Sequence, residues 1–357
     1  MNLRVLVVDD TIMYRKVVGD LLAEMPGVEV VGTANNGKIA LTRIASLKPD
    51  LITLDVEMPI MNGLETLEEI QKSYPDVGVI MLSTLTKRGS DITMRALELG
   101  AFDFIAKPDA EVMQENVQML RGAIGPRVKA FAKRMELRAL LKQRPRPVGA
   151  PAPVPAAPVV LTSSRRTGKS KAVAIGISTG GPNALTKMLP QLPKLGVPIF
   201  VVQHMPPVFT KSLAESLDAK CQYEVREAEN NEIVRPDVIY IAPGGKHMRV
   251  ASNTGGVKII QVTDDPPENN CKPAVDYLFR SVAREYGALS TGVIMTGMGG
   301  DGTLGLKVLK SFGAVTIGQD EESCVVYGMP KMAADAGVVD VVSPLQMIAP
   351  EIIRTVR

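Results

Sequence analysis

Cysteine and histidine are scarce in this 357-residue chain. Its three cysteines, Cys221, Cys271 and Cys324, are odd in number, lie far apart and form no C-x-x-C pair. This pattern argues against a disulfide framework and a zinc site, and it predicts free thiols in a reducing compartment. The only histidines are His204 and His247, so there are just two candidates for a histidine general base.

Long apolar runs and a strong net charge are also missing. No stretch approaches the roughly 18 apolar residues that span a bilayer, and the apolar run in the opening MNLRVLVVDD is too short for a signal peptide. We therefore expect a cytoplasmic protein without membrane insertion. The net charge of +3 is too small to argue for nucleic acid, and no basic recognition-helix module follows the linker. The 45% hydrophobic content suits packed globular domains.

The first 125 residues alternate between short apolar runs and helical patterns. Each run has the length of a buried strand, and each helical stretch repeats its apolar residues at helical spacing. This alternation predicts a doubly wound parallel α/β sheet of five strands. We expect the strands at residues 3–8, 28–34, 51–54, 79–82 and 103–106.

Polar residues stand where four of these strands end: Asp9, Asp10, Asp55, Ser83 and Lys107. The carboxyl ends of parallel strands share one edge of a sheet, so these side chains can converge. A single Asp at a strand end is commonly a helix N-cap, but five matched positions favour a site. Three carboxylates suit Mg²⁺, and with a hydroxyl and a lysine they can accept a phosphoryl group.

With these residues, the segment 1–125 resembles a response-regulator receiver domain. The resemblance implies that Asp55 accepts the phosphoryl group and that Phe104 occupies the position of the switching aromatic residue. It also implies a set of supporting roles: Mg²⁺ held by Asp10, Asp55 and the backbone carbonyl of Glu57, with Asp9 supporting, and phosphoryl oxygens contacted by Ser83 and Lys107.

Residues 126–170 have the composition of a basic and proline-rich linker. Prolines at positions 145, 147, 151, 153, 155 and 158 favour an extended spacer that builds no core. The GKS at 168–170 resembles the end of a P-loop, but Ser163 occupies the position of its first glycine. No strand precedes this segment, so we do not expect nucleotide binding there.

The remaining chain, residues 171–357, opens with an apolar run, Ala172–Ile177, that passes directly into glycines. The segment Gly176–Gly180 fits G-x-S-x-G, a strand-turn-helix motif that raises the hydroxyl of Ser178 above the end of a parallel sheet. Pro182 suits the first turn of the following helix. The N–H groups at the start of that helix suit a developing oxyanion.

Two further polar residues follow apolar strands in this half. His204 follows the run 198–203, and Asp301 follows the run 292–296 after several glycines. Together with Ser178 they offer a nucleophile, a base and a carboxylate that orients the base. The order Ser, His, Asp differs from that of α/β-hydrolases, so we expect another fold with the same chemistry. His247 is the competing base, but it opens a strand, and a structural or substrate-lining role is favoured.

A dinucleotide site is the alternative. Gly297, Gly299 and Gly302 spell G-x-G-x-x-G between a strand and a helix, and Asp320 follows the next strand. This pattern is typical of NAD(P)-dependent oxidoreductases. However, few residues remain after Asp320 to complete a nucleotide domain, and Asp301 within the motif would repel a pyrophosphate.

The segment 172–345 resembles the catalytic domain of the chemotaxis protein-glutamate methylesterases. The matching stretches are IGISTGGPNAL, VVQHMPPVFTKSLAESL, IYIAPGGKHM, KPAVDYLFRSVA, VIMTGMGGDGTLGL and GMPKMA. The resemblance implies an α/β domain with a mainly parallel sheet and a triad of Ser178, His204 and Asp301. It also implies an oxyanion hole formed by backbone N–H groups near Thr179 and Met298.

The same resemblance implies partners and a reaction. A chemotaxis histidine kinase would donate the phosphoryl group to the receiver domain. The catalytic domain would hydrolyse glutamate methyl esters on chemoreceptor cytoplasmic helices and release methanol. It would also deamidate receptor glutamines, and it would need no cofactor. At position 271, where the family often has a basic residue, this chain has Cys271.

Overall fold

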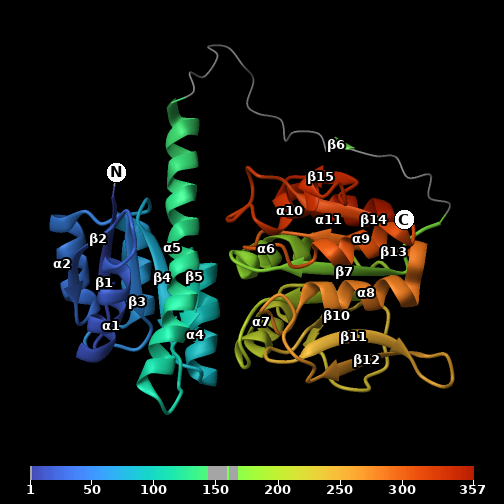
Figure 1. Cartoon of the computed structure of the whole chain (residues 1–357), viewed down its shortest axis with the longest axis horizontal. Coiled ribbons are helices and arrows are strands. Elements are labelled where there is room, and N and C mark those ends of the chain that lie inside the picture. The colour runs from blue at the N-terminus through green and yellow to red at the C-terminus, as the bar shows by residue number, and fades with distance from the viewer. Residues whose placement is uncertain (1, 144–158, 161–167) are drawn as a thin grey trace. The chain divides into compact units, whose positions relative to one another are not determined.

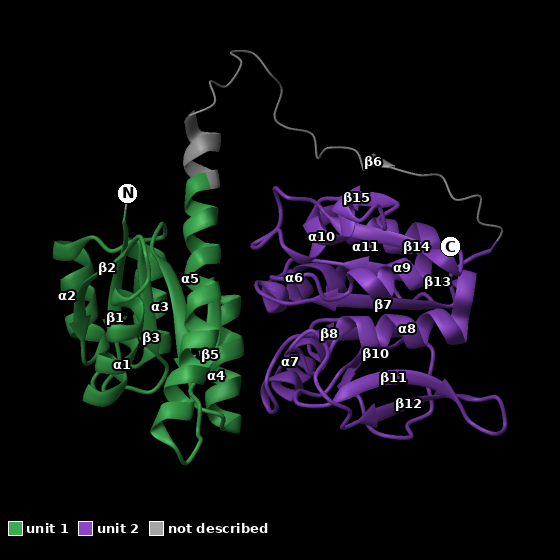
Figure 2. Cartoon of the chain, viewed as in Figure 1, with its two compact units in different colours: residues 1–144 green, residues 145–357 purple. Residues whose placement is uncertain are grey.

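The computed structural model describes residues 2–143, 159–160 and 168–357. The chain forms two compact units, residues 1–144 and 145–357, which Figure 2 shows in different colours. The prolines of the predicted linker, at positions 145–158, lie outside the described residues. In the described part of the chain, no helix has both the length and the hydropathy needed to cross a membrane.

The first unit contains a parallel sheet of five strands in the order β2-β1-β3-β4-β5. Its strands are almost entirely apolar, and the middle of the sheet is fully buried. The prediction of a doubly wound five-stranded sheet is confirmed. The strands are β1 (Leu3–Val8), β2 (Val28–Ala34), β3 (Leu51–Asp55), β4 (Gly78–Ser83) and β5 (Asp103–Ala106).

A helix follows each strand of this unit. The helices are α1 (Ile12–Ala23), α2 (Gly37–Leu47), α3 (Gly63–Ser73), α4 (Lys87–Glu98) and α5 (Met113–Gln143). Helix α3 starts at a capping box in which the side chain of Asn62 accepts from the Glu65 N–H and the Glu65 side chain accepts from the Asn62 N–H. Helix α4 starts earlier than its apolar pattern, which begins at Ile92, because its polar first turn is capped by Thr86.

The second unit contains an eight-stranded sheet in the order β6-β15-β14-β13-β7-β8-β10-β9. All neighbouring strands are parallel except β6 and β15, which are antiparallel. The mainly parallel sheet predicted for this half is therefore confirmed. The strands are β6 (Val159–Val160), β7 (Ala172–Ile177), β8 (Ile199–Gln203), β9 (Glu224–Glu227), β10 (Val238–Ile241), β13 (Ser290–Ile294), β14 (Val315–Gln319) and β15 (Val341–Ser343).

Helices cover this sheet, and a separate hairpin packs against one of them. The hairpin pairs β11 (His247–Ser252) with β12 (Lys258–Thr263) and packs against α8, beside which it lies in Figure 1. The core unites the sheet with α8 through Phe200, Tyr240, Val275 and Leu278. The α-helices are α6 (Gly181–Met188), α7 (Phe209–Asp218), α8 (Val275–Tyr286), α9 (Thr303–Ser311), α10 (Met329–Asp335) and α11 (Leu345–Val356), and short 3-10 helices span Leu189–Gln191 and Gly287–Leu289.

Candidate active site and phosphoryl-acceptor site

Ser178 is the first residue after β7, the central strand between β13 and β8. Its N–H donates to the Thr296 carbonyl at 3.0 Å, and its own carbonyl accepts from the Gly181 N–H at 2.8 Å. Gly180 has φ 75°, a left-handed conformation that lets the chain turn directly into α6. The sequence thus folds into the predicted strand, turn and helix around Ser178, which is partly buried.

Strand register places His204 beside Ser178. Ile177 of β7 pairs with Gln203 of β8, and each is the last residue of its strand. The N–H of His204 also donates to the Ile177 carbonyl at 3.1 Å. The next residues, Ser178 and His204, therefore start side by side at the carboxyl edge of the sheet.

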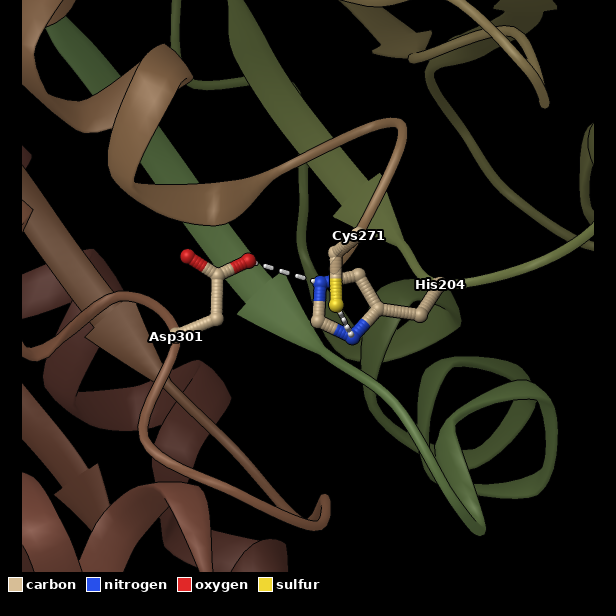
Figure 3. A group of neighbouring side chains, drawn as sticks. All are labelled: His204, Cys271 and Asp301. Atoms are coloured by element: carbon tan, nitrogen blue, oxygen red, sulfur yellow. Dashed lines mark hydrogen bonds and ion pairs between the residues drawn. The ribbon is translucent and has the colours of Figure 1, made fainter. Parts of the chain in front are cut away.

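Asp301 reaches the same edge through the glycine-rich loop between β13 and α9. Its Oδ2 lies 2.8 Å from His204 Nε2, and Figure 3 shows the carboxylate facing the imidazole. Three backbone or amide donors also bind it: the N–H of Val275 at 2.7 Å, the N–H of Asp276 at 3.0 Å and Asn269 Nδ2 at 3.0 Å. The tautomer that pairs with Asp301 carries its proton on Nε2 and leaves Nδ1 as the basic nitrogen.

The electrostatics of this pair stabilise its charged forms. Burial works to lower the pKa of His204, but hydrogen bonds with Asp301 and then Cys271 raise it to about 9. For Asp301, burial works to raise the pKa. Its hydrogen bonds with His204 and with the backbone N–H groups of Val275 and Asp276 hold the pKa below its ordinary value. A carboxylate in this state can orient the imidazole and stabilise an imidazolium.

Cys271 is a contact that sequence reasoning missed. Its Sγ lies 3.8 Å from His204 Nδ1, and Figure 3 shows the thiol and the Asp301 carboxylate approaching the same ring. In the described chain, His204, Cys271 and Asp301 form a group whose potential ligand atoms lie within 4.8 Å of one another. From the sequence, position 271 stood out only because this chain has a cysteine where the family often has a basic residue. Its distance along the chain from His204 hides the contact.

The competing base, His247, lies elsewhere with both ring nitrogens engaged. Its Nδ1 accepts from the Ala274 N–H at 3.2 Å, and its Nε2 lies 3.0 Å from the Pro266 carbonyl. The ring is fully buried and stacks on Tyr277 with centroids 4.5 Å apart. These contacts indicate that His247 stabilises the loop that leads into α8.

The alternative dinucleotide motif contributes to the serine site through Gly297 and Asp301. A Cβ at Gly297 would lie 2.8 Å from Ser178 Cβ, so only glycine fits against the serine there. Asp301, within the same motif, is 3% exposed and bound to His204. This arrangement leaves no role for the motif as a pyrophosphate cradle.

In the first unit, the predicted acidic residues meet Lys107 at the ends of β1, β3 and β5. Lys107 Nζ lies 2.8 Å from both Asp55 Oδ2 and Asp9 Oδ2, and all three side chains are buried. The carboxylates of Asp9, Asp10 and Asp55 have oxygens within 4.8 Å of one another. A cleft opens beside them and is lined by Asp10, Thr11, Tyr14, Asp55, Glu57, Thr84, Leu85, Thr86, Lys107, Pro108 and Asp109.

The charges in this cleft favour binding of a cation. Burial, followed by the charge of Asp9, raises the pKa of Asp55 to about 6, and Lys107 offsets only part of this rise. Burial works to lower the pKa of Lys107, but Asp55 and Asp9 raise it above its ordinary value. Because Lys107 does not fully offset the negative charges, the carboxylates still repel one another. Hard carboxylate oxygens of this kind at an open cleft fit the ligand preference of Mg²⁺.

Ser83 ends β4 at this edge but is fully buried, and its hydroxyl donates to the Gly89 carbonyl at 3.1 Å. Its neighbour Thr84 lines the cleft instead, together with Tyr14, whose ring lies under Lys107 with 4.6 Å between Nζ and the centroid. Sequence reasoning did not single out Thr84 or Tyr14. Thr84 could have been found as the second hydroxyl at the end of β4.

The first unit has a doubly wound sheet with an acidic cleft, and the second is an α/β unit with a His–Asp pair beside a serine. Together they define a response regulator with an enzymatic output domain. Family models agree: residues 5–118 match "Response regulator receiver domain" and residues 173–352 match "CheB methylesterase". The chain belongs to the protein-glutamate methylesterase family.

Relatives and a solved structure are similar along the chain. A protein-glutamate methylesterase/protein-glutamine glutaminase of Desulfotalea psychrophila is 57% identical over 100% of this chain and 99% of its own length. One of the same name from Bacillus subtilis is 44% identical over 99% of each chain. The crystal structure of the Thermotoga maritima CheB methylesterase catalytic domain superposes with a TM-score of 0.51 and 44% identity. It covers 52% of this chain and 98% of its own. The oxidoreductase alternative has no support among these relatives.

Proposed function

We propose that this chain hydrolyses glutamate methyl esters on the cytoplasmic helices of chemoreceptors and deamidates receptor glutamines by the same chemistry. The observation that carries the proposal is the 2.8 Å contact between His204 Nε2 and Asp301 Oδ2, with Ser178 just beyond the end of the neighbouring strand β7. The names of the relatives supply methyl esters of protein glutamates and protein glutamines as the substrate groups, and the resemblance to the chemotaxis family supplies the chemoreceptors. Because these helices are cytoplasmic, we expect the enzyme to act in the cytoplasm.

In the proposed reaction, Ser178 Oγ attacks the ester carbonyl while His204 Nδ1 takes the hydroxyl proton. Asp301 holds Nε2–H and stabilises the imidazolium. Backbone N–H groups of Thr179 and Met298 donate hydrogen bonds that stabilise the negative charge developing on the carbonyl oxygen. Collapse breaks the ester bond, and His204 returns its proton to the departing methanol. In the second step, His204 takes a proton from water, the water attacks the acyl group, and Ser178 receives the proton as glutamate is released. With a glutamine substrate, ammonia would leave in the first step in place of methanol.

The first unit is proposed to control this reaction. Asp55 takes the phosphoryl group from the phosphohistidine of a chemotaxis kinase. Asp10, Asp55 and the Glu57 carbonyl would hold Mg²⁺, with Asp9 supporting, and bound Mg²⁺ neutralises the charge that the phosphoryl group brings. Lys107 and Ser83 would contact phosphoryl oxygens, which requires the Ser83 hydroxyl to leave the Gly89 carbonyl. Residues 1–125 would then act as receiver and 171–357 as enzyme, with no cofactor for ester hydrolysis. Of the predicted linker 126–170, the described residues 126–143 instead continue helix α5 of the first unit, where Val128 and Phe131 are buried.

Replacing Ser178 with alanine tests the catalytic assignment. Ser178→Ala should abolish methanol release from methylated receptor membranes, because the nucleophile is removed while the backbone contacts of the turn remain. Far-UV circular dichroism and the thermal midpoint should match those of the unchanged protein. Substantial methanol release by a folded Ser178→Ala protein would contradict the assignment.

A further inference from the structure

A tight turn carries two side chains to the catalytic pair. Glu268 and Cys271 exchange backbone hydrogen bonds of 3.1 and 2.8 Å, which close a two-residue loop. The loop residues Asn269 and Asn270 both have left-handed φ, 53° and 59°. This pattern is typical of a type I′ turn, in which asparagine is favoured. The turn is short and closed, so the side chains on either side of its tip have little freedom to drift.

The Asn269 amide bridges two buried carboxylates. Its Nδ2 donates to Asp301 Oδ1 at 3.0 Å and to Asp276 Oδ2 at 3.0 Å. Asp301 and Asp276 are 3% and 1% exposed, whereas the turn itself lies at the surface. An amide nitrogen has two N–H bonds, one for each acid. The amide therefore places a neutral donor where two negative groups would otherwise face each other.

This bridge helps to direct the Asp301 carboxylate toward His204. In the described chain, His204 and Asn269 are the two side chains that donate to Asp301; its other partners are backbone N–H groups. Burial and the charge of Asp301 raise the pKa of Asp276. Asn269 binds Oδ1 of Asp301, so Oδ2 remains directed at Nε2 of His204.

The turn is anchored to the same helix that holds Asp276. Arg280 of α8 donates from both terminal nitrogens to the Glu268 carboxylate, at 2.5 and 2.6 Å. Such a two-point contact fixes orientation as well as distance. The Gly305 N–H donates to Asp276 Oδ1 at 2.6 Å from the start of α9. The base of α8, the turn and the loop that carries Asp301 thus form one connected network.

We propose that Asn269 is a positioning residue for catalysis, which holds Asp301 toward His204 and keeps a neutral donor between Asp301 and Asp276. The proposal rests on the assignment of Ser178, His204 and Asp301 as the catalytic residues. Asn269 itself contacts no reacting atom. Its effect passes through the orientation of one carboxylate and through the charge that His204 experiences.

Two substitutions separate these effects without straining the turn. Asn269→Gly keeps the left-handed backbone and removes only the amide, so we expect kcat to fall about tenfold, the equivalent of one charged hydrogen bond. KM should change much less. Asn269→Asp keeps size and turn preference but adds a negative charge, which stabilises the imidazolium. The acidic limb of kcat/KM should therefore move to higher pH by about one unit.

Asn270→Gly is the matched control, because Asn270 shares the turn, the exposure and the left-handed φ, whereas the bonds to Asp301 and Asp276 come from Asn269. It should leave kcat and the pH profile unchanged. An unchanged kcat in folded Asn269→Gly, or an unmoved acidic limb in Asn269→Asp, would overturn the proposal. His204→Ala, measured in parallel, keeps the two claims apart. Full activity in that variant would refute the catalytic assignment itself, whereas its inactivity beside normal Asn269 variants would refute only the role of Asn269.

Discussion

At the scale of single residues, the proposed reaction depends on the protonation of His204. A general base must be neutral to accept the Ser178 proton, and a group whose pKa is raised stays protonated to higher pH. Burial opposes the charge on His204, but the contacts with Asp301 and Cys271 outweigh it and raise the pKa to about 9. Ester hydrolysis should therefore increase as the pH rises through the pKa of His204.

The thiol beside His204 gives a direct test of this reasoning. Cys271→Ala removes a contact that raises the His204 pKa, so the imidazole should become neutral at lower pH. We expect the acidic limb of the kcat/KM profile to move to lower pH. Cys271→Ser is the matched control, since its hydroxyl keeps a polar group at this position, and it should shift the limb less. A limb that stays in place, or moves upward, in Cys271→Ala would show that the thiol does not tune the base.

Asp55 is the residue on which the phosphoryl group is expected. Its pKa, raised to about 6 by burial and then by Asp9, implies that the attacking carboxylate is lost below that pH. Labelling by a small phosphodonor should therefore weaken as the pH falls through 6. It should disappear in Asp55→Asn and in EDTA. Asp109→Asn, which lines the same cleft, should still be labelled. Full labelling of Asp55→Asn would place the acceptor elsewhere.

At the scale of secondary-structure elements, the sequence patterns predicted the features that position the sites. Apolar strands that end on polar residues indicated Asp55, Lys107 and Ser178, because parallel strands bring their carboxyl ends to one edge. Helix α8 (Val275–Tyr286) has an apolar repeat that runs from end to end, so its bounds can be read from its own residues. Such patterns are local, and each can be recognised within a single element.

Features that depend on distant contacts could not be predicted. Strand β9 (Glu224–Glu227) is short and mostly polar, and it is a strand because it pairs with β10 at the sheet edge. The bridge from Asn269 to Asp301 joins loops that are distant in sequence. Nothing in the residues around position 269 signals that partner, although the Asn-Asn pair does signal a tight turn.

The close approach of the β13–α9 loop to the β7 turn should be intolerant of a side chain. A Cβ at Gly297 would lie 2.8 Å from Ser178 Cβ and 2.3 Å from Met329 Sδ. The methionine can move, but the serine can yield only by leaving its position. We expect Gly297→Ala to lower kcat by about 10- to 100-fold, in line with displacement of a reacting group. Gly300→Ala, where a Cβ meets nothing nearer than 3.5 Å, should retain activity. Equal activities would show that Ser178 does not depend on this contact.

At the scale of the whole molecule, two units with separate cores are joined by a segment rich in proline. A tether of this kind keeps the first unit at high effective concentration near the second, so we propose that even a weak interaction of the unphosphorylated first unit lowers the rate of the enzyme. Moving a closed-to-open ratio from 99:1 to 1:99 requires about 5.5 kcal/mol of differential stability. Under the control that we propose, phosphorylation of Asp55 would need to supply only part of that energy to produce a measurable activation.

The most direct test is the rate of methanol release from methylated chemoreceptor membranes by the full chain, with and without a phosphodonor. The fragment 165–357 serves as the comparison, since the similar Thermotoga maritima catalytic domain was crystallised by itself. We expect methanol release by both proteins, a slower rate for the unphosphorylated full chain, and acceleration of the full chain alone by the phosphodonor. No methanol from either protein would contradict the proposed activity. A folded fragment no faster than the unphosphorylated full chain would contradict inhibition by the first unit.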